Sequence, residues 1–381
     1  MASSLIFKQH TPGRKHLGLG LLAAALALPT AGPARAENIP ERGQIGLKYL
    51  DYQERQPDQE RIHVGAASLM LMAPVAGVWS VSGSLTADTV SGASPAFHTA
   101  DFGQMKDLRK AADLSVTRYL PQGTLTLGGT YSTESDYVSR GLSLQGSLSS
   151  EDKNTTWTLG TSITRDHIDP SNHVVDDEKK HIVGLLLGVT QVMTMHDIVQ
   201  LNLGHTRGKG YYTDPYKSFD NRPRERNQST LLARWNHHFA STEGTTRLSY
   251  RYYTDSFGIR AHTLGAEYVQ PLPYGWTVTP LLRAHSQSAA DFYVEVDPGA
   301  APFPTNPPPG AIFFTEDQRM SAFGARTLGI KLAKQLDADW LLDIKYEQYE
   351  QHGKWNWSGK GSDGLAPFSA RYFMLGLMRQ F

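Results

Sequence analysis

Apolar and polar residues alternate with a period of two along most of the chain. In Val78–Asp88, Trp79, Val81 and Leu85 alternate with serine and threonine residues. Because this period places the two kinds of side chain on opposite faces of a strand, the segment predicts a β-strand with one apolar face. Glu178–Val192 alternates poorly, so its register stays open. The same alternation recurs in five further segments: Thr124–Thr130, Thr156–Thr164, Val199–Leu203, Arg247–Tyr252 and Trp340–Glu347.

One apolar segment is long enough on length alone for a transmembrane helix. Ile62–Ala87 contains no acidic residue, lysine or arginine. Pro74 and Gly77 interrupt its middle, however, and its second half alternates strictly. The segment therefore predicts a β-hairpin.

Turn signals fall into two classes that alternate along the chain. The first class is short: Ala73–Gly77, Pro121–Gly123, Ser149–Asn154, Met193–His196, Ala240–Gly244, Pro271–Gly275 and Asp337–Asp339. The second is mostly long and polar, with two tight members, Glu134–Asp136 and Asp255–Gly258, beside Glu54–Glu60, Ser91–Lys106, His167–Asp177, Lys209–Pro223, Ser288–Glu316 and His352–Pro367. Seven turns and eight loops predict sixteen strands, with fourteen or eighteen as the nearest alternatives.

Short turns on one side and long loops on the other are typical of an outer-membrane barrel, with the turns periplasmic and the loops extracellular. A sheet can cross lipid only when it closes, because an open edge leaves backbone groups without hydrogen bonds. The alternative is a soluble sandwich or propeller, which does not segregate turn lengths by side. We therefore predict an all-β fold, a closed antiparallel transmembrane barrel.

Aromatic residues near the strand ends predict two interfacial girdles. Trp79, Trp157, Trp276 and Trp340 each follow a short turn, whereas a second set lies toward the loops: Tyr131, Tyr137, Tyr252, Tyr253, Tyr346 and Tyr349. The chain ends with alternating Phe373, Leu375 and Leu377 and a terminal Phe381, which resembles the closing strand of Gram-negative outer-membrane proteins. Arg379 stands where an aromatic residue is commoner. This ending predicts recognition by the barrel-assembly machinery.

The first 36 residues have the features of a cleaved export signal. Lys8, Arg14 and Lys15 precede the apolar segment Leu17–Leu28, and Ala34-Arg35-Ala36 is an A-x-A cleavage site. We expect a signal peptide over 1–36 and a single barrel domain over 37–381. The chain has no cysteine, which excludes disulfides, thiolate metal sites and cysteine nucleophiles. Its 37 basic and 37 acidic residues cancel, so charge does not favour nucleic acid as a partner.

The alternation places charged residues of both signs on the polar face, where they would line the lumen. These candidates for binding are Arg234, Arg247, Arg251, Glu267, Asp343, Lys345 and Glu347. On the lipid face each charge would cost about 2–4 kcal/mol at mid-depth. The residues either select a solute or form a stabilising ladder.

The two tight loops share a pattern of tyrosine, threonine, an acidic residue with serine, and then Arg140 or Arg260. In one interpretation the acidic residue and serine set the turn while the arginine packs on a neighbour. In the other, the two hairpins form a repeated site for a ligand or partner at the barrel mouth.

Several segments resemble an uncharacterised family of secreted proteobacterial proteins, classed as a domain of unknown function. They are IGLKYLDYQERQP, TVSGASP, TESDYVSRGLSL, SSEDKNTTW, GYYTDPYKSFDNRPRERNQ, YYTDSFGIRAHTLGAE and the closing KQLDADW and LAPF. The resemblance implies an outer-membrane location and no reaction. It also implies gene neighbours that encode a thioredoxin-like protein, a small lipoprotein and a flavin transferase, which would belong to a redox or metal-related envelope pathway.

Catalytic and metal sites are not indicated. His237 and His238 are adjacent on a strand and face opposite ways, and the loop with His167, Asp169, His173, Asp176 and Asp177 is read as solvated. His205 and His262 are candidate bases, but no serine or aspartate can be placed beside them without strand registers. The sequence contains no G-x-S-x-G, H-E-x-x-H or P-loop motif. We therefore expect no enzyme, no metal and no cofactor.

These observations favour a porin-like channel or transporter for a small polar solute, with a partly occluded lumen. The Pro-rich segment Asp297–Gly310 is either a surface lid or an inward constriction. The first alternative is a non-channel barrel that docks a periplasmic or lipoprotein partner in an envelope redox or metal-related pathway. The second is a barrel-embedded hydrolase.

Overall fold

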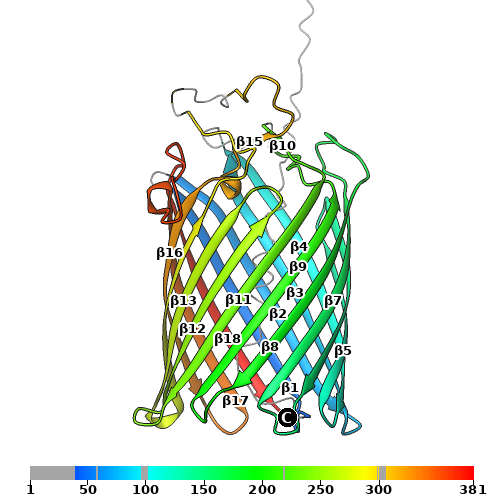
Figure 1. The fold of residues 1–381 in the computed structure, drawn as a ribbon, viewed down its shortest axis with the longest axis vertical. Helices are drawn as coiled ribbons and strands as arrows, with labels where there is room; N and C mark the ends of the chain where they lie inside the picture. Colours follow the sequence, from blue (N-terminus) through cyan, green and yellow to red (C-terminus); the bar gives the residue numbers. More distant parts are fainter. Residues whose placement is uncertain (1–38, 57–58, 96–101, 218, 298, 300–305) are drawn as a thin grey trace, which may run out of the picture.

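The computed structural model describes residues 39–56, 59–95, 102–217, 219–297, 299 and 306–381. Sixteen antiparallel strands close into one barrel, in which each strand pairs with the next along the chain and β1 pairs with the last (Figure 1). The predicted fold and strand count are confirmed. The wall strands are β1 (Gln44–Gln56), β2 (Gln59–Val75), β3 (Trp79–Pro95), β4 (Phe102–Leu120), β5 (Gly123–Thr133), β6 (Tyr137–Ser149), β7 (Thr155–Ile168), β8 (Glu178–Val192), β9 (Asp197–Gly210), β11 (Glu225–Phe239), β12 (Gly244–Asp255), β13 (Arg260–Leu272), β14 (Trp276–Gln287), β16 (Phe323–Gln335), β17 (Trp340–His352) and β18 (Phe368–Gln380).

Shorter elements lie in the connections. β10 (Asp220–Asn221) and β15 (Phe314–Thr315) form a separate two-stranded sheet. Within the described ranges, 3-10 turns follow wall strands or loops at η1 (Pro273–Gly275), η3 (Gln318–Met320) and η4 (Gly353–Trp355). No helix in the described ranges is long and apolar enough to span a membrane.

The outer face of the wall is apolar. Leu85, Leu142 and Leu159 expose 60%, 58% and 65% of their surface, while their strand neighbours one residue away are polar or small. The alternation therefore matches the closed sheet, with apolar side chains outside and polar ones inside. Such a surface suits contact with lipid chains.

The short connections lie together at one end of the barrel, which we call the turn end, and the other connections lie at the loop end (Figure 1). Ile62–Ala87 forms the β2–β3 hairpin, as predicted. Two predicted loops are wrong in extent. β1 continues to Gln56 and β2 begins at Gln59. Likewise, β3 continues to Pro95 and β4 begins at Phe102. The charged residues at these strand ends remain part of the wall. Strand pairing uses backbone hydrogen bonds and does not require apolar side chains.

At the turn end, aromatic rings are covered by cations. Arg118 lies 4.8 Å from the ring centre of Trp79, and Lys334 lies 5.2 Å from that of Trp276. Arg379 lies 5.4 Å from the ring centre of Trp340, which is its pairing partner on the neighbouring strand. The arginine in the closing strand therefore completes this girdle as a cation–π partner.

The predicted tyrosine girdle is wrong for half its members. Tyr131 and Tyr346 face outward and are exposed, and Tyr252 lies on the same outer face, where it contacts His262. Tyr137, Tyr253 and Tyr349 instead lie on the inner face, where Lys180, Asp255 and Gln351 are their hydrogen-bond partners. Position along the chain located the strand ends but did not separate neighbouring residues by face.

The two ends of the barrel sequence close the ring. Phe381 and Gly43 exchange backbone hydrogen bonds of 2.9 and 3.0 Å beyond the β1–β18 ladder. A Cβ on Gly43 would lie 2.5 Å from the Phe381 ring, so the ring packs directly on the backbone of the first strand. The expected signal peptide, 1–36, lies outside the described residues, as do residues 298 and 300–305 of the Pro-rich segment.

Candidate functional site

All seven lumen candidates lie on the inner face of the wall. Each is next to an outward residue of its own strand: Leu248 separates Arg247 from Ser249, and Ile344 separates Asp343 from Lys345. The seven occupy two areas. Asp343, Lys345 and Glu347 lie on β17, and Arg234, Arg247, Arg251 and Glu267 lie on β11, β12 and β13.

The β17 residues form a compensated ladder. Lys331 on β16 lies 3.7 Å from Asp343, and Lys345 forms an ion pair with Glu347. Asp343 and Glu347 expose only 14% and 9% of their side chains. Their charges are therefore paired and largely shielded, which suits a role in wall stability.

The residues on β11 to β14 form an arginine patch: Arg234, Arg247, Arg251 and Arg283. Arg247 lies 3.8 Å from Glu267, and Arg283 lies 4.0 Å from Glu347. Arg234 contacts the Gln200 side chain at 3.5 Å. Among the described residues, Arg234 and Arg251 form no ion pair. The patch therefore carries positive charge in excess.

Water reaches this patch. Arg234, Arg251 and Arg283 are exposed although they face inward, and the Arg283 side chain exposes 48% of its surface. A packed interior would bury them. Sequence reasoning missed Arg283 because Pro280 and the pair Leu281–Leu282 interrupt the alternation; the signal was its position next to lipid-facing Leu282.

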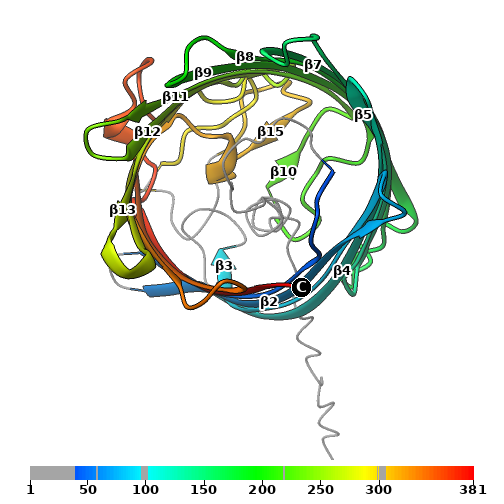
Figure 2. The same cartoon turned by 90° about the horizontal axis from the view of Figure 1, so that it is seen from below.

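Folded loops lie over the loop end of the lumen. β10 and β15 pair through Asp220 opposite Thr315 and Asn221 opposite Phe314. Seen along the barrel axis, this small sheet lies within the outline of the ring (Figure 2). We call the described parts of the loops between β9 and β11 and between β14 and β16 the cap. The two loops are separated in sequence and are held together by the β10–β15 pairing and by side chains.

A buried ionic cluster joins the two halves of the cap. Arg222 donates to Asp220 at 2.9 Å and to Asp317 at 2.7 Å, and its side chain is only 7% exposed. Arg319 donates to Asp317 and, at 2.8 Å, to Asp214. Burial acts against ionisation, but Arg319 and the other nearby cations hold the pKa of Asp317 well below its ordinary value. Asp317 is therefore ionised at neutral pH, whereas burial raises the pKa of the neighbouring Asp220.

The cap crosses the mouth. Arg61 on β2 donates to Gln318 at 3.2 Å and to Glu54 at 3.2 Å. A bulge in the β1–β2 ladder beside Arg61 turns this side chain inward, where it also covers the ring of Phe368 at 5.2 Å. β2 and β11 are eight strands apart in either direction round the ring. The contacts from Arg61 through Asp317 to Arg222, just before β11, therefore span the opening.

A second anchor joins the cap to the β5–β6 hairpin. Tyr216 donates to Asp136 of that hairpin and contacts Ser171 of the next loop. Asp107, Glu134 and Asp136 have carboxylate oxygens within 4.8 Å of one another. Burial, together with the negative charges of Asp107 and Asp136, raises the pKa of Glu134 from 4.5 to about 8. Glu134 is therefore largely protonated at neutral pH.

The two hairpin arginines do not point into the mouth. Arg140 faces outward, with its guanidinium 6.0 Å from the ring centre of Tyr131. Arg260 also lies on the outer face, two residues before His262, and its backbone pairs with Ser288. The structure thus places both arginines on the outside wall, away from the cap cluster.

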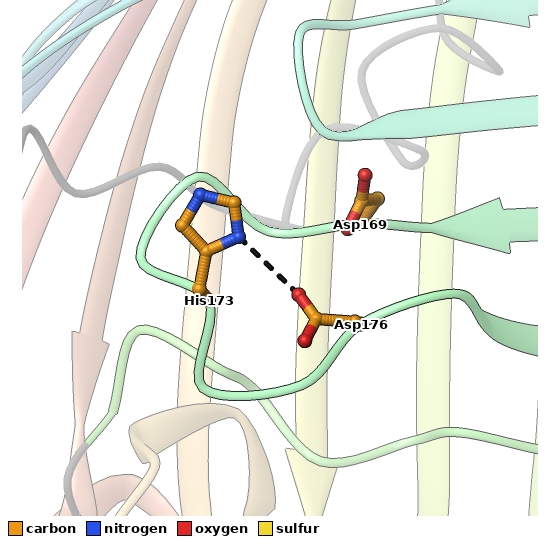
Figure 3. A group of neighbouring side chains, drawn as sticks. All are labelled: Asp169, His173 and Asp176. Carbon is orange, nitrogen blue, oxygen red and sulfur yellow. Dashed lines mark hydrogen bonds and ion pairs between the residues drawn. The ribbon is translucent and has the colours of Figure 1, made fainter.

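The histidines have local polar partners. His173 contacts Asp176 at 3.2 Å and lies near Asp169 on an exposed loop (Figure 3). These three side chains offer ligand atoms within 4.8 Å of one another, but all three are solvent-exposed. The strand registers place Ser229 Oγ 3.0 Å from His205 Nδ1, on the outer wall. No described carboxylate pairs with His205, so this pair lacks the orienting acid of a hydrolase triad.

Adjacent histidines on β11 face opposite ways, as the alternation predicts. His237 contacts Asp197 at 2.7 Å, whereas His238 contacts Thr245 at 3.2 Å. Each imidazole is satisfied by its own neighbour.

Comparisons with known proteins agree with the geometry. Residues 101–372 match the family described as Protein of unknown function (DUF3570). The chain is similar in fold to a bacterial polysaccharide outer membrane secretin (TM-score 0.51, 9% identity, 89% of this chain and 98% of that one). Lower scores relate it to the siderophore receptor PirA from Pseudomonas aeruginosa (0.46, 8%, 91% and 81%) and to OccD3 (OpdP) from the same organism (0.43, 12%, 94% and 96%). No curated protein sequence matches the chain.

The molecule is thus an outer-membrane β-barrel of a Gram-negative bacterium. The resemblance found in the sequence is confirmed.

Proposed function

Since this chain belongs to the DUF3570 family and forms an outer-membrane barrel, we propose that it is a channel for small anionic solutes whose mouth is controlled by the cap. The observation that carries the proposal is the exposure of Arg234, Arg251 and Arg283 on the inner wall. Inward arginines that contact water attract anions and repel cations along the pore.

The anion preference follows from the pairing pattern. Glu267 and Glu347 approach two of the four arginines only at 3.8 and 4.0 Å, and Arg234 and Arg251 have no described ionic partner. An anion passing the patch would gain contacts that the protein does not itself supply. Arg also binds carboxylate and phosphate groups bidentately, which suits small organic anions.

Planar-bilayer recording of the mature barrel tests this proposal. Under a KCl gradient, the wild type should show a reversal potential of the sign that marks anion selectivity. Arg234→Gln with Arg251→Gln should reduce that potential. Arg326→Gln is the matched control because Arg326 is an arginine on the outer face, paired with Glu350 at 2.6 Å. A cation-selective wild type, or equal effects of the lumen and control variants, would contradict the proposal.

A second function is favoured by the cap, which spans the mouth between β2 and β11. A barrel closed in this way suits the docking of a periplasmic or lipoprotein partner. If the wild-type protein and the cap variant Arg222→Met both stay silent in the bilayer, the result would support docking. Conductance that appears or grows in Arg222→Met supports a channel controlled by the cap.

A further inference from the structure

A row of basic side chains crosses the outer wall near the loop end. Its members are paired neighbours on β6, β7, β8 and β9: Arg140, Arg165, His181 and Lys209. Arg140 and Arg165 lie two residues from Leu142 and Ile163, which expose 58% and 49% of their surface to the lipid side. The row therefore faces outward, at the loop-end edge of the apolar band.

The centre of this basic row lacks compensation from the protein. Arg140 and Arg165 lie directly opposite each other in the ladder, and like charges at such positions destabilise a sheet. Lys209 pairs with Glu225 at 2.7 Å. Arg140 lies over the Tyr131 ring, and neither arginine forms an ion pair with any residue in the described ranges.

The opposite side of the barrel differs. Arg326 on β16 lies two residues above Leu328, which is 55% exposed, as Arg140 lies two residues above Leu142. β16 and β6 are eight strands apart in either direction. Arg326, however, is neutralised by Glu350 at 2.6 Å. The positive charge at Arg326 is therefore compensated, whereas that at Arg140 and Arg165 is not.

The row lies within side-chain reach of the outer-leaflet headgroups. Trp157 marks the periplasmic interface on β7, and Arg165 is eight residues further along the strand. At about 3.3 Å per residue and a tilt of about 40°, Arg165 lies about 20 Å above Trp157. The apolar band is about 25 Å tall, and an arginine side chain extends toward the headgroups.

An apolar groove lies beside the row on the same wall. It has a volume of about 600 Å³ and is lined by leucines of β2, β3 and β4, by Gly83 and Gly129, and by Tyr131. The guanidinium of Arg140 covers the Tyr131 ring, so the groove leads directly to the row. A Cβ on Gly129 would meet nothing closer than 3.9 Å, so the missing side chain leaves open space rather than relieving a clash.

We infer that this wall binds one phosphorylated glycolipid of the outer leaflet, with Arg140 and Arg165 on a phosphate and the groove along an acyl chain. The outer leaflet of such membranes is built from glycolipids with phosphate groups. A phosphate between the two arginines would replace their repulsion with charge-assisted hydrogen bonds. The leucine-lined groove is apolar, as an acyl chain is. An acyl chain would fill the space that the glycines leave open and contact the leucines around it. This site is separate from the lumen and independent of the proposed channel.

Binding of bisphosphorylated lipid A to the full mature barrel in nonionic detergent tests the inference by native mass spectrometry. The same glycolipid without phosphates is the comparison ligand. Wild-type protein should bind the bisphosphorylated form at least about tenfold more tightly, since one charge-assisted hydrogen bond corresponds to about that factor. Arg140→Gln with Arg165→Gln should abolish this preference, whereas Arg326→Gln should retain it.

Two further variants separate the parts of the site. Gly129→Leu fills the groove without changing charge, so it should weaken binding of both glycolipids by a similar factor. The double arginine variant without glycolipid should resist heat at least as well as wild type, because it removes a like-charge contact. Arg165→Lys alone should keep the preference if the double variant does not fold. Equal wild-type affinity for the two glycolipids, or an unchanged preference in the double variant, would overturn the inference.

Discussion

Removing Arg222 should open the cap. This side chain is 7% exposed and donates to Asp220 and Asp317, whose side chains are 0% and 1% exposed. Arg222→Met preserves much of the volume but leaves both carboxylates without this cation. Breaking a buried ion pair from one side costs about 3–5 kcal/mol. Because Arg319 still pairs with Asp317, we expect the lower value, about 3 kcal/mol.

Hydrogen exchange measured by mass spectrometry over residues 211–224 reports this free energy. The Asp214 amide donates to the Asp220 carboxylate at 2.6 Å, and the Arg222 amide donates to Thr213 Oγ1 at 3.0 Å, so both exchange only when the cap opens. A loss of about 3 kcal/mol corresponds to protection about 100-fold lower.

Lys360→Met is the matched control for this measurement. Lys360 forms an ion pair with Asp363 at 3.1 Å in another loop at the same end, but the two side chains are 85% and 75% exposed. Such a surface pair is worth about 0–1 kcal/mol, so protection should change less than about fivefold. If Arg222→Met changed protection no more than Lys360→Met, the buried cluster would not hold the cap closed, and the reasoning would be refuted.

Three further predictions concern the hairpin, a close contact and the girdle. Because the pKa of Glu134 is raised to about 8 by burial and by nearby carboxylates, its contribution to stability is complete below pH 4.5 and is lost as pH rises through 8. The protection factors of the β5–β6 hairpin amides, which are corrected for the intrinsic rise of exchange with pH, should therefore fall over this range by at most about tenfold per pH unit, and Glu134→Gln should make them independent of pH. A Cβ on Gly324 would lie 1.9 Å from the carbonyl oxygen of Trp355, so Gly324→Ala should displace η4, at a cost of about 1–3 kcal/mol, and change the tryptophan fluorescence; an unchanged spectrum would contradict it. Arg379→Ala should lower the free energy of unfolding in urea by about 0.5–1 kcal/mol through loss of its contact with Trp340, and Arg379→Lys should recover part of it.

The lumen candidates show how far the sequence reaches. Arg247 and Glu267 were placed on the inner face by alternation alone, and the structure pairs them across β12 and β13 at 3.8 Å. Their partnership required the register, which alternation does not specify between strands. Arg61 shows the opposite case. The alternation along β2 would place the Arg61 side chain on the outer face. The bulge beside Arg61 turns it inward instead.

Long-range contacts account for what the sequence did not predict. Asp214, Arg222, Asp317 and Arg319 lie in polar loops without periodicity, and their charges become a cluster only when two loops separated by about a hundred residues meet over the mouth. The hairpin motif left open whether Arg140 packs on a neighbour or serves a site at the mouth; the strand turns its side chain outward, over the Tyr131 ring and opposite Arg165.

The sequence by itself determined the number of strands and, where the alternation is clear, which face meets lipid, because these depend on a local period of two and on turn chemistry within a few residues. Tertiary structure alone decided which charges meet. Ring closure sets the neighbours and the register sets the height of each side chain, so the open arginine patch, the cap across the lumen and the uncompensated pair on the outer wall exist only in the folded barrel.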